Sequence, residues 1–276
     1  MSRITTIGDV NVDWIVEVEN VDLPIRSLSR EANNCIITSL GGGGAIFAIA
    51  AQDAGFESHL LGRVGNDVLG DFALQTLVHH GVKLSVARDC HHDTGKILVV
   101  RDRSDRKMMV SHRGANVMFI TKDVNWEILK ESDIIYISGY ALLEEPQSRT
   151  CLDIIHFARQ TGVQVILDIV PHRVFSGHLS TNYSESLSLV QGVVLELGTA
   201  HGLLGSKDLS EHAVLQKLLL TYNFVVLSPD NDSQIIATRT RTFHVPTQYS
   251  QAKERLGYLD RLTAKVMINY LRGNYN

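Results

Sequence analysis

The sequence is poor in cysteine and has no long apolar or basic run. Its three cysteines, Cys35, Cys90 and Cys151, are widely spaced and outside any CxxC pair, which predicts reduced structural thiols. No stretch approaches the roughly 20 apolar residues that cross a bilayer, and no leader-like segment precedes the first strand-like run. A net charge of −4 without a basic run argues against a nucleic-acid partner. We therefore expect a cytoplasmic protein that binds neither membranes nor nucleic acid.

Common metal and nucleotide motifs are also missing. None of the twelve histidines falls in an HExxH or similar spacing, and the pairs His79-His80 and His91-His92 stand in polar surroundings, as surface histidines do. The glycine run that begins at Gly41 is followed by neither the GK[ST] of a P-loop nor the GxGxxG spacing of a dinucleotide site. The sequence predicts no protein ligands for a metal.

From about Gly41 onward, the chain alternates short apolar runs with helix-length amphipathic segments. That alternation is typical of βαβ units that feed a parallel sheet. Continuous apolar runs such as IIYIS and VILDIV predict strands that helices bury on both faces. We expect an α/β fold of three layers (α/β/α) around a mostly parallel central sheet, in a single domain over residues 1–276.

Two segments, residues 16–40 and 96–112, alternate apolar with polar side chains instead. The second contains DRSDR between two such runs, which predicts a hairpin turn. No helical segments accompany these strands, so we place them in a small β-sheet that projects from the main sheet. Such a projection can serve as a lid over a substrate site or as the surface of a homodimer.

A glycine run, Gly41 to Gly44, precedes an alanine-rich helical segment that ends near Gly55. Bare backbone at this place lets a ligand approach closely and points the amino end of a helix at it. The same run also fits tight packing between a strand and a helix. Taken alone, it leaves both interpretations open.

A second run, GRVGNDVLGDF, follows the next strand-like segment. Together the two runs resemble the first signature of the ribokinase-like (PfkB) family of carbohydrate and nucleoside kinases, roughly GGxxAN, an alanine-rich helix ending in LG, then GxVGxDxxG. The matching residues are Gly41, Gly42, Ala45, Gly55, Gly62, Val64, Gly65, Asp67 and Gly70. The resemblance implies a ribokinase-like fold with a β-sheet lid and ATP-dependent transfer of a phosphoryl group to a hydroxyl group.

The resemblance extends over residues 3–273. In GDVNVDWIV, Asn11 and Asp13 occupy the places of an Asn and an Asp that contact substrate hydroxyls in the family. One departure on this side is Ile46, where the family usually has Asn. The resemblance implies a sugar or nucleoside substrate bound by Asn11, Asp13, Gly41, Gly42, Gly43 and Arg113, the last from the RGAN element after the lid.

The family's second signature, close to DTTGAGDxFxAG, corresponds here to ERLGYLDRLTAKV. The resemblance makes Asp260 the general base for the attacking hydroxyl and Gly257 part of an anion hole for the transferred phosphoryl group. It also implies ATP and Mg²⁺ as cofactors, with Ser228 and Gly257 on the nucleotide side. The apolar spacing after Gly257 predicts a helix over residues 258–271.

The nucleotide-side elements depart from the family pattern. Tyr258-Leu259 replaces a small residue and a glycine of the anion hole. Gly198 and His201 take the places of an NxxE pair associated with Mg²⁺, and SPDNDS, from Ser228, lacks both glycines of a TxGxxG turn. Few residues follow Asp260, whereas family members continue for several dozen, so the resemblance implies an incomplete nucleotide cleft.

Two functions remain open at this point. The first is a kinase that transfers the γ-phosphoryl group of ATP to a sugar or nucleoside, with the lid excluding water. The second is a degenerate family member (a pseudokinase) that binds a small ligand or a protein partner without phosphoryl transfer. Single residues also have simpler interpretations: Asp260 as a helix cap, Asp13 as a solvated carboxylate, Arg113 and Arg173 in surface ion pairs, and Asp67 as the residue that orders its turn.

Overall fold

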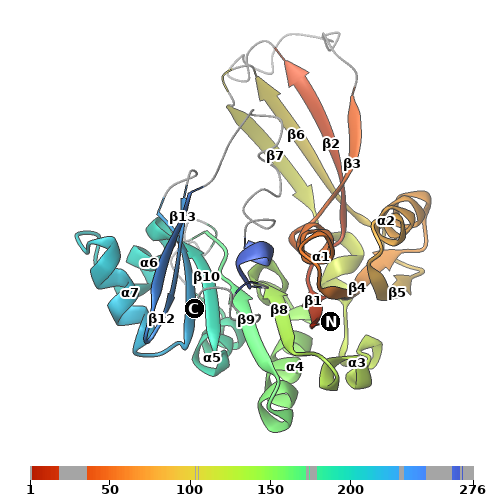
Figure 1. Ribbon diagram of the computed structural model, residues 1–276. Helices are drawn as coiled ribbons and strands as arrows, with labels where there is room; N and C mark the ends of the chain where they lie inside the picture. Colours follow the sequence, from red (N-terminus) through yellow and green to blue (C-terminus); the bar gives the residue numbers. More distant parts are fainter. Residues whose placement is uncertain are drawn as a thin grey trace.

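The computed structural model describes residues 2–18, 36–102, 104, 106–171, 174, 179–229, 233–246, 263–267 and 269. In Figure 1 these residues form a body around a nine-stranded sheet, and a four-stranded sheet projects from that body. The predicted α/β class, the mostly parallel central sheet and the small additional sheet are confirmed.

The central sheet has the strand order β13-β12-β11-β10-β9-β8-β1-β4-β5. Every pairing from β11 to β5 is parallel, whereas β12 and β13 add antiparallel strands at one edge, which the sequence did not predict. The strands are β1 (Arg3–Ile7), β4 (Glu57–Gly65), β5 (Lys83–Asp89), β8 (Ile134–Ser138), β9 (Gln164–Asp168), β10 (Gly192–Glu196), β11 (Phe224–Ser228), β12 (Ser233–Thr238) and β13 (Thr242–Pro246).

Strand β8 shows why the sheet has a hydrophobic layer on each face. Successive side chains of a strand point to opposite faces. Accordingly Ile135 and Ile137 belong to one buried cluster, and Ile134 and Tyr136 belong to another on the opposite face. All five residues of β8 are buried. The uninterrupted apolar run therefore reflects burial on both faces, as predicted.

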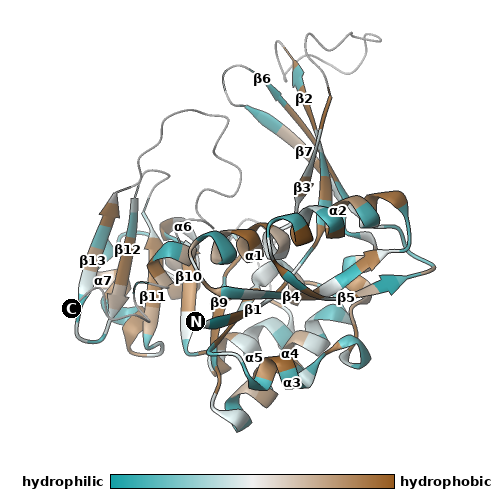
Figure 2. Ribbon diagram, turned by 45° about the vertical axis from the view of Figure 1, so that its right-hand side comes forward, coloured by the Kyte–Doolittle hydropathy of each residue, from teal (hydrophilic) through white to brown (hydrophobic). Residues whose placement is uncertain are grey.

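Helices cover both faces of the sheet and complete the three layers (Figure 2). One face is covered by α3 (Trp126–Lys130), α4 (Gln147–Thr161), α5 (Thr181–Leu189), α6 (Leu197–Leu204) and α7 (Glu211–Leu219). The other is covered by α1 (Gly43–Asp53), α2 (Val68–His79) and the helical residues 263–267. Short 3₁₀ helices are η1 (Gly114–Met118), η2 (Thr121–Asp123) and η3 (Gly139–Leu142).

The predicted C-terminal helix is confirmed only where the structure describes it, at residues 263–267 and 269. Ala264, Val266 and Met267 are buried against the sheet beside Phe224. The remaining residues of the predicted range 258–271 lie outside the described residues. In the described part of the chain, no helix combines the length and the hydropathy needed to span a membrane.

The projecting sheet, called the lid here, consists of β2 (Asn11–Val18), β3 (Ile37–Gly41), β6 (Gly95–Asp102) and β7 (Lys107–His112), in the order β3-β2-β6-β7. The predicted hairpin at DRSDR is confirmed, since β6 and β7 pair antiparallel. Strand β2 begins at Asn11, before the predicted start at residue 16. The reason is that the first residues of β2 are buried on both faces. The alternation of apolar and polar residues that predicted the lid strands therefore begins only after them.

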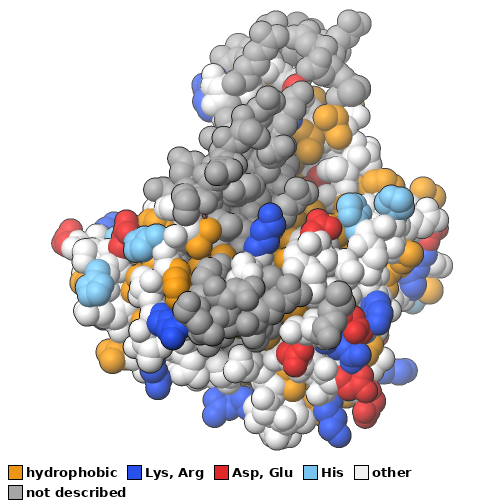
Figure 3. Space-filling model, in the orientation of Figure 1, with side chains coloured by type: hydrophobic (Ala, Val, Ile, Leu, Met, Phe, Trp, Pro, Cys, Tyr) orange, Lys and Arg blue, Asp and Glu red, His pale blue; other side chains and the backbone are white. Residues whose placement is uncertain are grey.

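The strand register divides the lid into two faces. Asn11 and Asp13 share one face with their partners Gly41 and Gly95. The opposite face, called the outer lid face here, carries apolar side chains: Val12, Trp14, Val16, Leu98, Val100, Met108 and Val110. Several of them are exposed, and Figure 3 shows hydrophobic side chains at the surface of the described part of the lid.

Candidate functional site

The candidate site lies at the carboxyl ends of β1 and β8. Strand β1 pairs with β4 on one side and with β8 on the other. Helix α1, which precedes β4, and helix α4, which follows β8, lie on opposite faces of the sheet. Such a reversal of strand order is where open α/β sheets bind ligands. Gly43 reaches this point, since a Cβ atom there would lie 2.9 Å from Ser138 Oγ.

The amino end of α1 is built from backbone that only glycine can supply. Gly42, the residue before the helix, has φ +91°, and a Cβ atom there would lie 2.3 Å from Asp9 O. Ala45 N–H donates to Asp9 O at 3.2 Å, while the N–H groups of Gly43 and Gly44 have no acceptor among the described residues. The tight packing predicted for the run is therefore confirmed, whereas the approach of a ligand to its backbone stays a prediction.

Asp13 is a buried carboxyl group of the lid strand β2, with 6% of the residue exposed. It lies over Gly41, where a Cβ atom would come within 2.0 Å of Asp13 Oδ1. Oδ1 is itself buried and has no hydrogen-bond partner among the described residues. Burial raises the pKa of Asp13 to about 6. The alternative of a solvated strand-end carboxylate is wrong.

Asn11 lies at the base of the same strand and is also buried. Its Oδ1 accepts a hydrogen bond of 2.8 Å from Asn116 Nδ2. A Cβ atom at Gly95 would lie 2.0 Å from Asn11 Oδ1, so glycine at that position leaves room for the contact. The lid face that carries Asp13 therefore also presents Asn11.

Arg113 joins the end of the lid to the body through a buried ion pair. Its Nε and Nη2 both donate to the Asp9 carboxylate at 2.9 Å, and Nη1 donates to Glu144 at 3.1 Å. Gln147 Nε2 also donates to Asp9, at 3.1 Å. Burial opposes the charge of Arg113, but the hydrogen bonds and negative charges of Asp9 and Glu144 together outweigh it and raise the pKa of Arg113. The arginine side chain is 14% exposed, so the interpretation as a surface ion pair is wrong; direct contact with a substrate stays a prediction.

Asp67 orders the glycine-rich turn before α2, as predicted. Its carboxylate accepts hydrogen bonds from Gly70 N–H at 2.7 Å, Thr94 N–H at 2.8 Å and Thr94 Oγ1 at 2.7 Å. Burial opposes its charge, yet these bonds together lower the pKa of Asp67. Since Thr94 precedes the lid strand β6, the turn also anchors the base of the lid.

On the nucleotide side, the structure describes Ser228 but not Gly257, Asp260 or Arg173, which lie outside the described residues. Ser228 ends β11, at the same edge of the sheet as Ser138, and is buried. Gln234 Nε2 donates to Ser228 Oγ at 3.4 Å and to Thr263 Oγ1 at 3.1 Å. The roles of Ser228, Gly257 and Asp260 in binding a nucleotide and in catalysis remain predictions.

The described residues do not fit a protein-bound Mg²⁺ ion at the place where the family pattern has NxxE. Gly198 carries no ligand atom, and His201 Nε2 is hydrogen-bonded to Leu209 O at 2.9 Å. In the portions of the chain that the structure describes, no three His, Cys, Asp or Glu side chains cluster as metal ligands.

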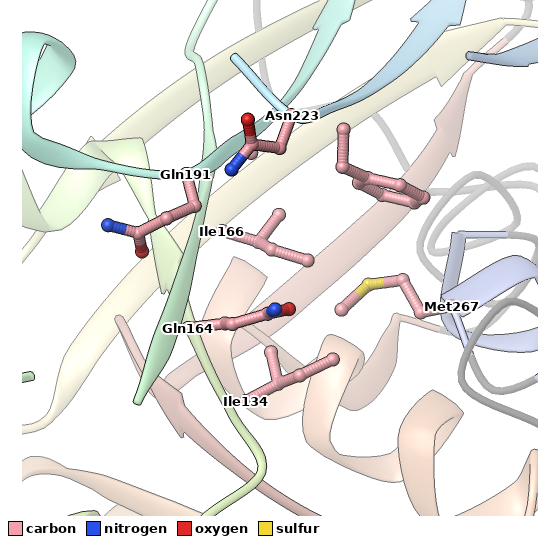
Figure 4. Close-up of a pocket in the computed structure, with 8 residues that line it drawn as sticks. Ile134, Gln164, Ile166, Gln191, Asn223 and Met267 are labelled. Carbon is pink, nitrogen blue, oxygen red and sulfur yellow. The ribbon is translucent and has the colours of Figure 1, made fainter. Parts of the chain in front are cut away.

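A small cavity of about 30 Å³ lies at the opposite end of the sheet, at the amino ends of β8 to β11. Figure 4 shows Met267 facing Ile134 and Ile166 across it, with the amides of Gln164, Gln191 and Asn223 near its rim. A volume of this size accommodates little more than water. It is not the substrate site.

Sequence reasoning missed several residues that build the site. Ser138, Asp9 and Asn116 received no individual role, although Asn116 belongs to the RGAN element that carried the resemblance. The cysteines that the structure describes, Cys90 and Cys151, are both free thiols, as predicted. Cys151 is buried, as a structural thiol is, whereas Cys90 is exposed, so the prediction of a structural role is wrong for Cys90. Cys35 lies outside the described residues.

Comparisons with known proteins agree with this geometry. The sequence model of the pfkB family of carbohydrate kinases matches residues 1–253. An ATP-dependent 6-phosphofructokinase of Thermoanaerobacterium thermosaccharolyticum is 22% identical over 98% of this chain and 82% of its own length. Among solved structures, adenosine kinase from Sinorhizobium meliloti has a TM-score of 0.82 at 16% identity, covering 98% of this chain and 87% of that one. A fructokinase with bound ATP from Xylella fastidiosa has a TM-score of 0.80 at 16% identity, covering 99% and 82%.

Proposed function

The chain belongs to the pfkB family of carbohydrate kinases, and from that premise we propose that it transfers the γ-phosphoryl group of ATP to a hydroxyl group of a sugar or nucleoside. The observation that carries the proposal is the carboxyl group of Asp13, buried, with an Oδ1 that has no partner among the described residues. A buried polar atom without a partner is unfavourable unless a ligand satisfies it. A substrate hydroxyl that donates a hydrogen bond would do so.

The substrate side of the site suits a polyol. Asn11 and Asp13 project from the same lid face, and the glycines at the amino end of α1 place no side chains of their own there. Amide and carboxylate groups together can pair with several hydroxyls. The relatives named above act on a sugar phosphate, a nucleoside and a sugar, which supports a substrate from these classes for this chain.

In the proposed reaction, an oxygen of the substrate attacks the γ-phosphorus of ATP. The new O–P bond forms as the bond from that phosphorus to the β,γ-bridging oxygen breaks, and ADP leaves. Asp260 takes the proton of the attacking hydroxyl, and backbone N–H groups near Gly257 stabilise the transferred phosphoryl group. The lid residues Asn11 and Asp13 orient the substrate and reduce its exchange with water.

The test measures ADP release by the purified protein with ATP, Mg²⁺ and a panel of D-fructose, fructose 6-phosphate, D-ribose and adenosine. We expect substrate-dependent turnover with at least one compound. Asp260→Asn should lower kcat by about 10²-fold or more, as loss of a general base does. A protein that folds normally, binds ATP and turns over no compound would exclude the kinase proposal for this panel.

A second candidate, a family member that binds its ligand without phosphoryl transfer, is favoured by one observation. The positions equivalent to the NxxE pair hold Gly198 and His201, which supply no carboxylate, and His201 is already bonded to Leu209 O. Calorimetry separates the two candidates. Sugar or nucleoside binding without binding of ATP and Mg²⁺ would support the second candidate, whereas tight ATP binding with turnover would exclude it.

A further inference from the structure

Asn116 is a fully buried side chain at the base of the lid to which the proposed function assigns no role. It lies in η1, directly after the last lid strand. Its Oδ1 accepts from Val10 N–H, and the two hydrogens of its Nδ2 are shared among three acceptors, the carbonyl oxygens of Val10 and Arg113 and Asn11 Oδ1. A buried amide that is satisfied on both ends has a defined orientation.

Backbone groups fix the positions of the oxygen and the nitrogen of the Asn116 side-chain amide. The N–H of Val10 can only donate, and it lies 2.7 Å from Asn116 Oδ1. The carbonyl oxygens of Arg113 and Val10 can only accept, and they lie 2.8 Å and 3.2 Å from Asn116 Nδ2. Reversing the amide would place donor against donor at one end and acceptor against acceptor at the other.

The orientation of the Asn116 amide in turn fixes the orientation of the Asn11 amide. Asn116 Nδ2 donates to the nearer end of the Asn11 side chain at 2.8 Å, so this end must be the oxygen. Asn11 Nδ2 therefore points away from Asn116, and it has no hydrogen-bond partner among the described residues. The small residue Gly95 permits the contact, because a Cβ atom there would lie 2.4 Å from Asn116 Nδ2.

Asn11 and Asp13 stand two residues apart on one lid face, so the orientation of Asn11 sets the hydrogen-bonding character of the site. Asp13 Oδ1 is a buried acceptor without a partner in the described part of the chain. With Asn11 presenting its NH₂ group, the face offers one donor and one acceptor. A hydroxyl oxygen can accept from the donor while a second hydroxyl donates to the acceptor.

We propose that Asn116 is a positioning residue that holds Asn11 with its NH₂ group toward the substrate, so that this position donates to an oxygen of the substrate while Asp13 accepts from a neighbouring hydroxyl. The inference rests on the proposed substrate site. It restricts the substrate to a compound that carries an accepting oxygen beside a hydroxyl, as polyols and nucleosides do.

The first experiment compares Asn116→Asp with Asn125→Asp. In Asn116→Asp, one carboxylate oxygen still accepts from Val10 N–H. The other takes the place of Nδ2, so it loses the bonds to the carbonyl oxygens of Arg113 and Val10, and it favours the reversed Asn11 amide, which presents oxygen to the substrate. We expect KM for the preferred compound of the panel to rise by about tenfold or more, with kcat changed by less than about threefold. Asn125→Asp adds the same charge at the exposed cap of α3, where Asp caps equally well, and should change neither constant.

A double-mutant test shows whether Asn116 acts through Asn11. In an Asn11→Ala background, Asn116→Asp should raise KM no further, because the amide it reorients is gone. Equal KM increases by Asn116→Asp with and without the Asn11 side chain would overturn the proposal. So would an unchanged KM in a single variant whose thermal unfolding is normal.

A ligand-free measurement separates failure of this inference from failure of the proposed function and from poor folding of a variant. Side-chain amide signals of ¹⁵N-asparagine-labelled wild-type protein are recorded by NMR, with Asn11 assigned by its loss in Asn11→Ala. We expect the NH₂ hydrogens of Asn116 to exchange with water at least about tenfold more slowly than those of Asn11, because both hydrogens of Asn116 are bonded within the protein. Equal or reversed protection would show that Asn11 is not oriented by Asn116, whatever the panel assay finds.

Discussion

Burial of the Asp13 carboxyl group acts against folding at neutral pH. Its pKa in the folded protein is about 6, against an ordinary value of 3.8, because burial disfavours the charged form. The folded state therefore binds more protons than the unfolded state between these values. The stabilising contribution of the protonated group is fully present below about pH 4 and is lost as pH rises through about 6.

We expect Asp13→Asn to remove this dependence. The free energy of unfolding of the variant relative to wild type should rise by about 2–3 kcal/mol between pH 4 and pH 7, while substrate affinity falls. Urea denaturation at a series of pH values measures the first quantity, and calorimetry with the preferred substrate measures the second. A constant difference across this range would show that Asp13 does not have the raised pKa.

Gly42 is a second residue whose local geometry leads to a prediction. Gly42→Ala should destabilise the protein by about 2–4 kcal/mol, because the backbone has φ +91° and the new Cβ atom would approach Asp9 O to 2.3 Å. Gly198→Ala is the matched control. It lies in α6 with nothing within 4 Å of its Cβ position, so it should be neutral or stabilising by up to about 1 kcal/mol. Thermal unfolding of the two variants measures the difference in stability between them. Similar losses of stability in both variants would contradict the prediction.

At the scale of elements, the connection between lid and body depends on contacts between segments far apart in the sequence. Arg113, at the start of η1, reaches Asp9 after β1 and Gln147 in the first turn of α4. Asp67, at the start of α2, binds Thr94 before β6. These contacts hold the ends of the lid strands beside the carboxyl ends of β1 and β4, which places Asn11 and Asp13 over the amino end of α1.

Removal of Arg113 should therefore be costly. Arg113→Leu leaves the Asp9 carboxylate buried without its cation, and we expect a loss of about 3–5 kcal/mol in the free energy of unfolding. In Arg149→Leu, the lost ion pair with Asp153 is exposed, so the change should stay within about 0.5 kcal/mol. Denaturant unfolding of both variants checks the prediction. Comparable losses in the free energy of unfolding would show that the Arg113–Asp9 ion pair stabilises the protein no more than an exposed ion pair does.

At the scale of the whole molecule, the outer lid face exposes apolar side chains among the described lid residues. Leu98, Met108 and Val110 are each at least 36% exposed there. Exposed apolar patches of this kind often bind another protein, and β7 also offers an open strand edge. We expect the chain to form a homodimer through this face.

The homodimer prediction is tested by sedimentation of Val110→Lys, with Val78→Lys as control. Val110 is 58% exposed on the outer lid face, and Val78 is 60% exposed on α2. We expect wild type and Val78→Lys to sediment as dimers and Val110→Lys as a monomer, because a buried lysine charge weakens an apolar interface. A monomeric wild-type protein would exclude the dimer.

Patterns along the sequence are enough to predict most of the local elements and the class of fold. The glycine run and alanine-rich segment predicted α1, and continuous apolar runs predicted β8 and β9, because burial on both faces of a sheet requires apolar residues at successive positions of the strand. Signature residues also assigned Asn11, Asp13 and Gly42 to one candidate site. The antiparallel strands β12 and β13 went unpredicted, since no comparable run of apolar residues marks them.

The pairing of those residues, by contrast, depends on how the chain folds in space. The structure shows a hydrogen bond from Asn116 to Asn11, an ion pair of Arg113 with Asp9, and an Oδ1 of Asp13 without a partner among the described residues. The paired groups are distant along the chain. Local sequence patterns record which residues are buried, but not which buried polar atom meets which partner. The partners depend on the register of the strands and on how the lid packs against the body. They therefore also set which polar atoms are left to bind a substrate.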